Sequence, residues 1–193
     1  MRKLLLLSSL LLASFFAQAQ NAVEALAAKV ASSTVSFDYS YLIKMQFTVK
    51  GSGSVTVCGS SFRMEGDGLV ICCDGATRWT ADEEARELVL EAVDDEQSAF
   101  AVNPALMISA LDSAFSLTDN GGGSYTLVPK ANTGLKLLKL GFKGERLVTA
   151  AMTFPNGIVV DLTISGMKFT SPLPASSFCY TEVDSSWVVT DLR

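Results

Sequence analysis

Apolar and polar residues alternate along most of this chain, and the alternation predicts β-strands. From Val35 to Val49 every second residue is apolar, which is the period of a half-buried strand or hairpin. The stretch is too long for one ordinary strand, so we expect the chain to reverse near residues 43–46. Two glycines that follow, Gly51 and Gly53, are expected bulge or bend positions.

Shorter strands follow, separated by turn residues. The dipeptide Asp67-Gly68 is a strong hairpin signal, and as a two-residue turn it sets Met64 opposite Ile71 and Phe62 opposite Cys73. Alternation predicts the following strands: 55–58, 62–66, 69–73, one containing Trp79, 86–93, 138–142, 148–154 and 158–164. Together these segments indicate an antiparallel meander with one apolar face.

Two segments change to the helical period. Asn21 opens a weak capping box, and the apolar spacing after it predicts a helix over about residues 22–32. Asn103-Pro104 opens a second helix, with Met107, Leu111 and Phe115 on one stripe. We therefore expect a mainly β protein of about ten strands, curved or closed into a barrel, with two short helices on one side.

The N-terminus has the form of an export signal. Met1-Arg2-Lys3 precedes a short apolar run and the small-residue triplet Ala17-Gln18-Ala19. The run is shorter than the roughly 20 apolar residues that span a bilayer, so we expect residues 1–19 to be a signal peptide cleaved before Gln20. Residues 20–193 then form one domain outside the cytoplasm.

Charge and residue types narrow the possible functions. Without Arg2 and Lys3 the 15 basic residues fall to 13 against 20 acidic ones, a net charge of −7 that opposes nucleic-acid binding. The chain has no histidine, its serine pairs lack a nucleophile motif, and its carboxylate runs at 83–84 and 94–96 lack calcium-loop spacing. We therefore expect no enzymatic activity, no cofactor and no metal.

Four cysteines leave the disulfide pairing open. On a strand, the adjacent Cys72 and Cys73 point to opposite faces. Cys58 shares the outer face with Cys72 but lies about two strands away, beyond the roughly 6 Å Cα separation of a disulfide. The remaining cysteine is Cys179, and the spacing lacks the paired C-x-x-C units of a zinc site.

The inward-facing apolar residues predict either a filled core or an apolar cavity. A curved sheet of about ten strands is wider than its own side chains need to fill, which favours a cavity covered by the helices. Trp79 joins the lining if the turn at Asp74-Gly75 has three residues. The predicted lining residues are Phe37, Tyr39, Tyr41, Phe47, Val57, Phe62, Met64, Ile71, Trp79, Leu88, Leu90, Met107, Leu111, Leu140, Phe142, Met152, Phe154 and Ile164.

Several motifs, in their order along the chain, resemble the periplasmic outer-membrane lipoprotein carrier family, LolA-like. They are Ser61-Phe62-Arg63-Met64, Asp74-Gly75-Ala76-Thr77-Arg78-Trp79, the helix at Asn103-Pro104 and Tyr125-Thr126-Leu127-Val128-Pro129-Lys130. Positions 62, 63, 74, 75, 79 and 129 match the family pattern. Met64 stands where the family often has an aromatic residue, and Cys58-Gly59-Ser60 replaces a basic, proline-containing stretch whose arginine helps to hold the lid. The resemblance is therefore to a divergent member.

The resemblance implies an incomplete, strongly curved antiparallel β-barrel with helices as a lid over an apolar cavity. It implies a monomeric periplasmic chaperone that takes acylated lipoproteins from an inner-membrane lipoprotein-releasing transporter and carries them to the outer membrane, where the acceptor is unknown. The alternatives are a lipid- or lipoprotein-sensing regulatory domain of the same fold, a hydrolase of lipids or cell-wall fragments, and a structural β-domain with a filled core.

Overall fold

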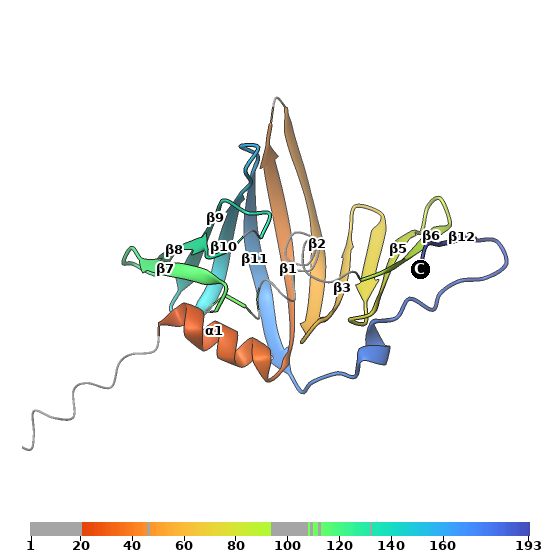
Figure 1. Cartoon of the computed structure of the whole chain (residues 1–193), viewed down its shortest axis with the longest axis horizontal. Helices are drawn as coiled ribbons and strands as arrows, with labels where there is room; N and C mark the ends of the chain where they lie inside the picture. Colours follow the sequence, from red (N-terminus) through yellow and green to blue (C-terminus); the bar gives the residue numbers. More distant parts are fainter. Residues whose placement is uncertain (1–20, 46, 94–107, 109, 112, 132) are drawn as a thin grey trace, which may run out of the picture.

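A single sheet of twelve strands makes up most of the molecule (Figure 1). The computed structural model describes residues 21–45, 47–93, 108, 110–111, 113–131 and 133–193. Their elements are α1 (Ala22–Ala31), β1 (Thr34–Lys44), β2 (Thr48–Cys58), β3 (Ser61–Gly66), β4 (Leu69–Cys73), β5 (Thr77–Asp82), β6 (Glu87–Ala92), β7 (Phe115–Asp119), β8 (Ser124–Pro129), β9 (Leu137–Lys143), β10 (Arg146–Thr153), β11 (Val159–Thr170), the 3-10 helix η1 (Ala175–Phe178) and β12 (Val188–Asp191).

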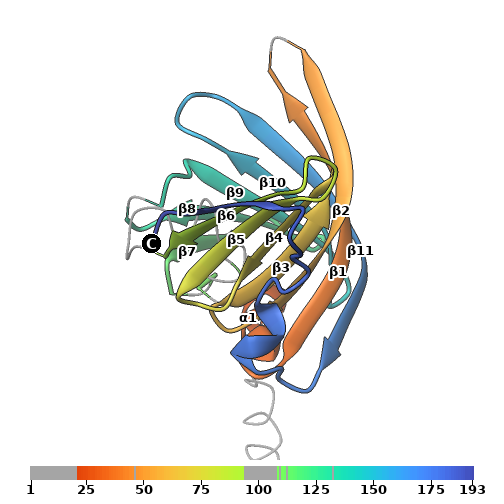
Figure 2. The ribbon, with the colours of Figure 1, turned by 90° about the vertical axis from the view of Figure 1, so that its right-hand side faces the viewer.

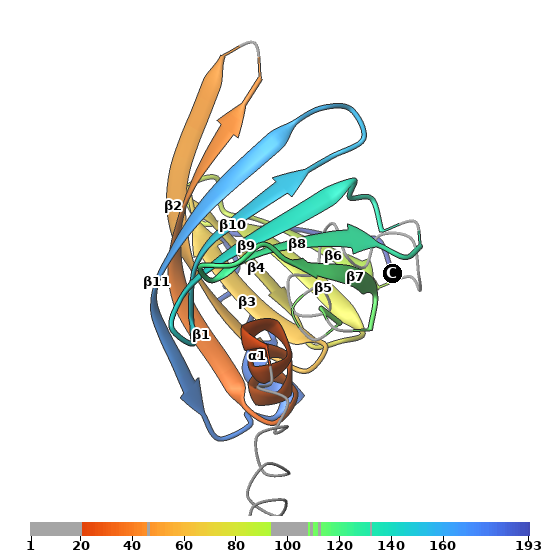
Figure 3. The same cartoon turned by 90° about the vertical axis from the view of Figure 1, so that its left-hand side faces the viewer.

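The strand order across the sheet is β12-β6-β5-β4-β3-β2-β1-β11-β10-β9-β8-β7. Consecutive strands pair as antiparallel neighbours within each half, and the long pairing of β1 with β11 joins the two halves. Figures 2 and 3 show the sheet curling around a concave side, with β12 and β7 as its two edges. The predicted mainly β architecture is confirmed, as one open curved sheet.

Three details differ from the prediction. The sheet has twelve strands in the part of the chain described, where about ten were expected. The last strand, β12, is parallel to β6, because the C-terminal chain crosses the sheet before it pairs at the edge. The second predicted helix lies outside the described residues up to position 107, and Phe115, expected on its stripe, instead begins β7 opposite Pro129.

A bulge bends the central pair of strands. The register of β1 with β11 shifts between Ser36 and Asp38, so that Gly166 and Met167 stand opposite Phe37 alone. Gly166 has φ 65°, a left-handed conformation that glycine adopts without the steric cost of a side chain. Because a bulge increases the local twist and bends its strand, this irregularity contributes to the curvature that creates a concave side.

Two tyrosines of β1 lie over two glycines of β2. Tyr39 is in register with Gly53 and Tyr41 with Gly51. A Cβ atom built on Gly53 would stand 2.7 Å from the Tyr39 hydroxyl and would overlap the carbonyl oxygen of Glu65, and one on Gly51 would stand 2.6 Å from the Tyr41 hydroxyl. The ladder is regular here, so these glycines are not the predicted bulges; they leave room for the phenol rings.

The N-terminal helix begins as its capping sequence predicts. The side-chain Oδ1 of Asn21 accepts a hydrogen bond from the backbone N–H of Glu24 at 2.9 Å. The helix ends at Ala31, within one residue of the expected boundary. Its buried stripe packs on the concave side of the sheet and consists of Val23, Leu26, Ala27 and Val30.

The opposite, convex side is covered by the C-terminal segment, residues 171–193. This segment passes through η1 and crosses the outer side of β3–β6 before β12 pairs with β6 (Figure 2). Tyr180 of this segment is buried against side chains of β4, β5 and β6, and Trp187 of the same segment packs beside Tyr180. The sheet therefore has apolar packing on both faces near this edge.

We expect Gly53→Ala to lower the free energy of unfolding by about 1–3 kcal/mol, because the added methyl group overpacks the contact between Tyr39 and β3. Urea denaturation measures the change. Ser52→Ala is the matched control on the neighbouring, exposed position and should stay within about 0.5 kcal/mol of the wild type. Equal stability of the two variants would show that the close approach at Gly53 does not constrain the fold.

Candidate functional site

Two apolar clusters share the concave side of the sheet. The first joins α1 to the half formed by β7–β11, and it includes an edge-to-face contact of Tyr125 with Phe142 at a centroid distance of 5.5 Å. The second lies on β1–β4 and has Val57 and Phe62 at its centre, both almost fully buried. Phe37, at the bulge between the halves, packs against both clusters.

An apolar pocket of about 520 Å³ lies between these clusters. This volume is within the range of about 300–1,000 Å³ that small-molecule pockets occupy. Polar side-chain atoms reach the lining from Tyr39, Arg78 and Thr80, and the other lining residues are apolar. The lining residues are Phe37, Tyr39, Val55, Met64, Ile71, Arg78, Thr80, Ile108, Leu111, Leu138, Leu140, Leu147, Ala150, Met152, Leu162 and Ile164.

Arg78 brings a positive charge to the pocket wall and pairs it with Glu91 on the next strand. The guanidinium Nε and Nη2 donate to the Glu91 Oε2 at 3.1 and 2.5 Å, and the two residues are in register between β5 and β6. The two side chains are 28% and 36% exposed. Because water reaches both partners, an ion pair of this kind contributes only about 0–1 kcal/mol to stability.

The structure places eight of the predicted lining residues around this pocket: Phe37, Tyr39, Met64, Ile71, Leu111, Leu140, Met152 and Ile164. Four others belong to the concave clusters beside it: Val57, Phe62, Phe142 and Phe154. The predicted pairing across Asp67-Gly68 is confirmed, with Met64 opposite Ile71. Contact of these residues with a ligand stays a prediction.

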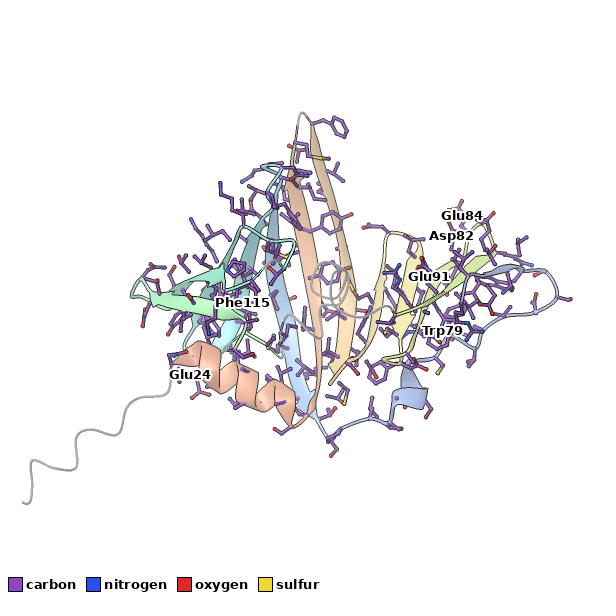
Figure 4. All side chains as sticks on the ribbon, viewed as in Figure 1. Glu24, Trp79, Asp82, Glu84, Glu91 and Phe115 are labelled. Atoms are coloured by element: carbon purple, nitrogen blue, oxygen red, sulfur yellow. The ribbon has the colours of Figure 1, made fainter. Side chains whose placement is uncertain are left out.

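Three residues that were predicted to line the pocket lie on the convex face of the sheet, opposite the pocket. Trp79, Leu88 and Leu90 belong to the convex cluster under the C-terminal segment. The backbone N–H of Asp74 bonds to the carbonyl oxygen of Thr77, so the turn holds two residues and Trp79 stands opposite Cys72. Figure 4 shows Trp79 on the side of the C-terminal segment, far from Phe115 of the first concave cluster.

The remaining three lie elsewhere. Phe47 is 68% exposed at the tip of the β1–β2 hairpin, which extends beyond the neighbouring strands (Figure 1). Tyr41 lies on the same hairpin and donates a hydrogen bond to the Asp67 carboxylate at 2.6 Å, which raises the pKa of the phenol by favouring its protonated form. Met107 lies outside the described residues.

A bulge and the length of a turn explain three of the lining residues that the predicted set omitted. A register shift between Leu147 and Thr149 turns Leu147 to the concave side, where unbroken alternation predicts Val148. Arg78 and Thr80 line the pocket because the two-residue turn sends Trp79 outward. The other omitted residues are Val55, Ile108, Leu138, Ala150 and Leu162, of which four follow the alternation of their strands.

The described part of the chain lacks two other kinds of site. Its cysteines and carboxylates form no group of three or more that is arranged to hold a metal ion. None of its helices combines the length and the apolar character needed to cross a membrane. The concave pocket, where apolar side chains of both halves of the sheet converge, is the candidate functional site.

Comparison with known proteins finds similarity in structure. No family model and no curated protein matches the chain. An uncharacterized conserved protein from Thermus thermophilus matches with a TM-score of 0.52 at 14% identity, over 88% of this chain and 96% of its own. This likeness shows a shared fold along nearly the whole chain.

Two further solved structures carry names from the family that the sequence motifs resemble. A LolA superfamily protein from Nitrosomonas europaea is 10% identical, with a TM-score of 0.44 over 82% of this chain and 97% of its own. A putative outer membrane lipoprotein-sorting protein domain from Vibrio parahaemolyticus is 12% identical, with a TM-score of 0.44 over 81% of this chain and 94% of its own. The Thermus protein alone among these three exceeds a TM-score of 0.5, so the shared fold rests on that match.

We expect Leu88→Ala to lower the stability of the protein without changing how tightly its pocket binds an apolar ligand. Removing this buried convex side chain should lower the free energy of unfolding by about 2–5 kcal/mol. The affinity of the folded variant for an apolar fluorescent dye should stay within twofold of the wild type, because the pocket lies on the other face. Leu140→Ala is the matched control, equally buried but on the pocket, and should change both quantities. Weaker dye binding by folded Leu88→Ala would contradict this assignment of faces.

Proposed function

We propose that this protein is a non-enzymatic periplasmic chaperone that holds the acyl chains of lipoproteins in its concave pocket, as a divergent LolA-like carrier. The observation that carries the proposal is the 520 Å³ pocket, where apolar side chains from both halves of one curved sheet converge. The ordered motifs of the sequence support the same family. The Thermus protein supports the fold without indicating a ligand.

Burial of hydrocarbon supplies the affinity in this proposal. Withdrawing an acyl chain of about 16 carbons from water is worth roughly 12 kcal/mol, at about 0.8 kcal/mol per methylene. The lining needs few specific contacts for such a ligand. Met64 and Met152, on opposite walls, have flexible thioether side chains that adapt to different chain positions. Release of the cargo is then the more demanding step, because the same burial opposes it.

The helices are assigned the role of a lid. Ile108 and Leu111, at the end of the second predicted helix, contribute to the pocket lining. Leu26 and Val30 of α1 belong to the concave cluster that borders the pocket, and Figure 3 shows α1 beside the ends of the strands on that side. Movement of the helices would open the pocket, which suits a carrier that must take up and release its cargo.

The wall of the pocket also offers a place for a polar head group. An acyl chain of a lipoprotein ends in an ester or amide linkage, which needs hydrogen-bond donors when it leaves water. Arg78 carries five N–H donors, and Glu91 occupies part of them through a half-solvated pair. Arg78 is therefore assigned to the polar end of the cargo.

In this proposal the partners come from the resemblance to the LolA-like family, and the compartment comes from the pattern at the N-terminus. A signal peptide over residues 1–19 would deliver the chain to the periplasm, where an inner-membrane lipoprotein-releasing transporter supplies the cargo and an outer-membrane acceptor of unknown identity receives it. The net charge of −7 after cleavage opposes adsorption to anionic membrane surfaces. A carrier that moves between two membranes as a monomer benefits from that repulsion.

The test is binding of a synthetic diacylated lipopeptide, followed by fluorescence of a labelled acyl chain. Met152→Glu should weaken binding at least tenfold, because a carboxylate on the pocket wall must be desolvated by the hydrocarbon. Phe47→Glu, a matched charge at the exposed hairpin tip, should bind like the wild type. Circular dichroism and thermal melts verify that both variants are folded.

Undiminished binding by folded Met152→Glu would reject this pocket as the acyl site. Failure of the wild type to bind any acylated peptide would reject the proposal and favour a filled core. Transfer to outer-membrane vesicles then separates a carrier from a sensor of the same fold. Tight binding without transfer, combined with ligand-dependent association with a regulatory protein, would favour the sensor.

A further inference from the structure

The C-terminal segment is held against the convex face by a small number of side chains. Phe178, the last residue of η1, is 1% exposed and Tyr180 is 5% exposed, and they flank Cys179, whose backbone is extended. The Tyr180 hydroxyl lies 3.4 Å from the Glu83 Oε1, at the far end of the β5 strand. The segment therefore crosses the strands in one defined position, with Cys179 fixed between two buried aromatic side chains.

This position brings Cys179 beside Cys72. The Cys179 Sγ lies 3.9 Å from the Oδ2 of Asp74, which follows β4 two residues after Cys72. Residues two apart in an extended strand point to the same face, about 6–7 Å from one another. Cys72 is fully buried in the convex cluster, and Cys179 packs against the same cluster. Both thiols therefore belong to the one convex cluster between the sheet and the segment.

The electrostatics of Cys72 agree with this placement. Burial is the largest cause that raises the pKa of the Cys72 thiol, and the nearby Cys179 is among the smaller causes. The Nη1 of Arg63 lies 3.6 Å from the Cys72 Sγ and opposes the shift. Burial and Asp74 also raise the pKa of Cys179. Both sulfurs are therefore protonated thiols at neutral pH while the segment is docked.

The other two cysteines have different positions. Cys73 is buried on the concave side, beside Val57 and Phe62. Cys58 lies on β2, which β3 separates from β4, and its Sγ is 3.5 Å from the carbonyl oxygen of Leu173. Two strand spacings amount to about 9–10 Å, beyond the Cα separation that a disulfide tolerates. Cys179 is therefore the partner that the fold offers to Cys72.

We propose that Cys72 and Cys179, which are free thiols in the structure, form a disulfide that ties the C-terminal segment to β4. In an oxidising compartment the electron acceptor is the disulfide of a protein thiol oxidant. The thiolate of one cysteine attacks that disulfide and forms a mixed disulfide, and the thiolate of the other then displaces the oxidant as a dithiol. One S–S bond forms in this chain, one is reduced in the oxidant, and two protons leave the cysteines and appear on the dithiol.

Because Cys72 is fully buried once the segment has docked, a protein oxidant reaches it only while the segment is undocked, during folding. The disulfide then keeps the C-terminal segment over the convex cluster, which contains Trp79 and Leu88. It also closes a loop of about 100 residues, the length for which a cross-link restricts the unfolded chain strongly. This inference is independent of the proposed carrier function, since it concerns the face opposite the pocket.

The test uses the full chain exported to an oxidising compartment and alkylated after denaturation without reductant. Mass spectrometry should show two alkylated cysteines, Cys58 and Cys73, and one cross-linked peptide. Because Cys72 and Cys73 share a peptide, the Cys73→Ala variant should retain the cross-link and Cys72→Ala should lose it. Reductant should lower the Tm of the wild type by about 5 °C or more and leave that of Cys179→Ser unchanged.

Two results would overturn the proposal. One is four alkylated cysteines in protein refolded with excess oxidised glutathione, which supplies a disulfide of the required class. The other is a cross-link that joins Cys179 to Cys58 or Cys73, or that persists in Cys72→Ala. Either result is obtained without any lipid ligand, so it does not bear on whether the concave pocket binds acyl chains.

Discussion

The rest of the structure depends on one constraint: a single layer of strands carries apolar side chains on both faces and must cover each of them. β4 shows the problem in five residues, with Ile71 and Cys73 on the concave face and Val70 and Cys72 on the convex face. Curvature, aided by the bulge opposite Phe37, lets the sheet face itself on the concave side. On the convex side curvature cannot bring apolar side chains of the sheet together, and the C-terminal segment covers them instead.

The two solutions leave the faces with different properties. The convex cluster is closed by aromatic side chains of a segment that pairs with the sheet edge through β12. The concave clusters meet at Phe37, and the pocket occupies the space between the curved halves. The proposed carrier role therefore belongs to the concave face, which holds the pocket, and the proposed disulfide to the convex face, which the C-terminal segment covers.

Local signals in the sequence predicted local structure well. Asp67 and Gly68 both have positive φ, as the two-residue turn requires, and the pairing of Met64 with Ile71 follows from that turn. The cap at Asn21 likewise began its helix. Prediction failed where the face of the sheet on which a side chain lies depends on whether a turn has two or three residues. The turn after Asp74 has two, so Trp79 lies on the convex face with Leu88 and Leu90. It failed also at Phe47, because alternation does not reveal how far a hairpin extends beyond its neighbours.

Most of the strands, the helix start, the apolar alternation and the acidic balance could be predicted from the sequence alone, because each depends on neighbouring residues or on composition. The tertiary structure decided which apolar residues line a pocket and which are covered by another segment. That choice depends on bulges, on the order of strands across the sheet and on the return of the C-terminal chain more than 100 residues after β4. Cys72 and Cys179 illustrate the difference: their spacing along the chain carries no signal, and only the crossing of that segment brings them together.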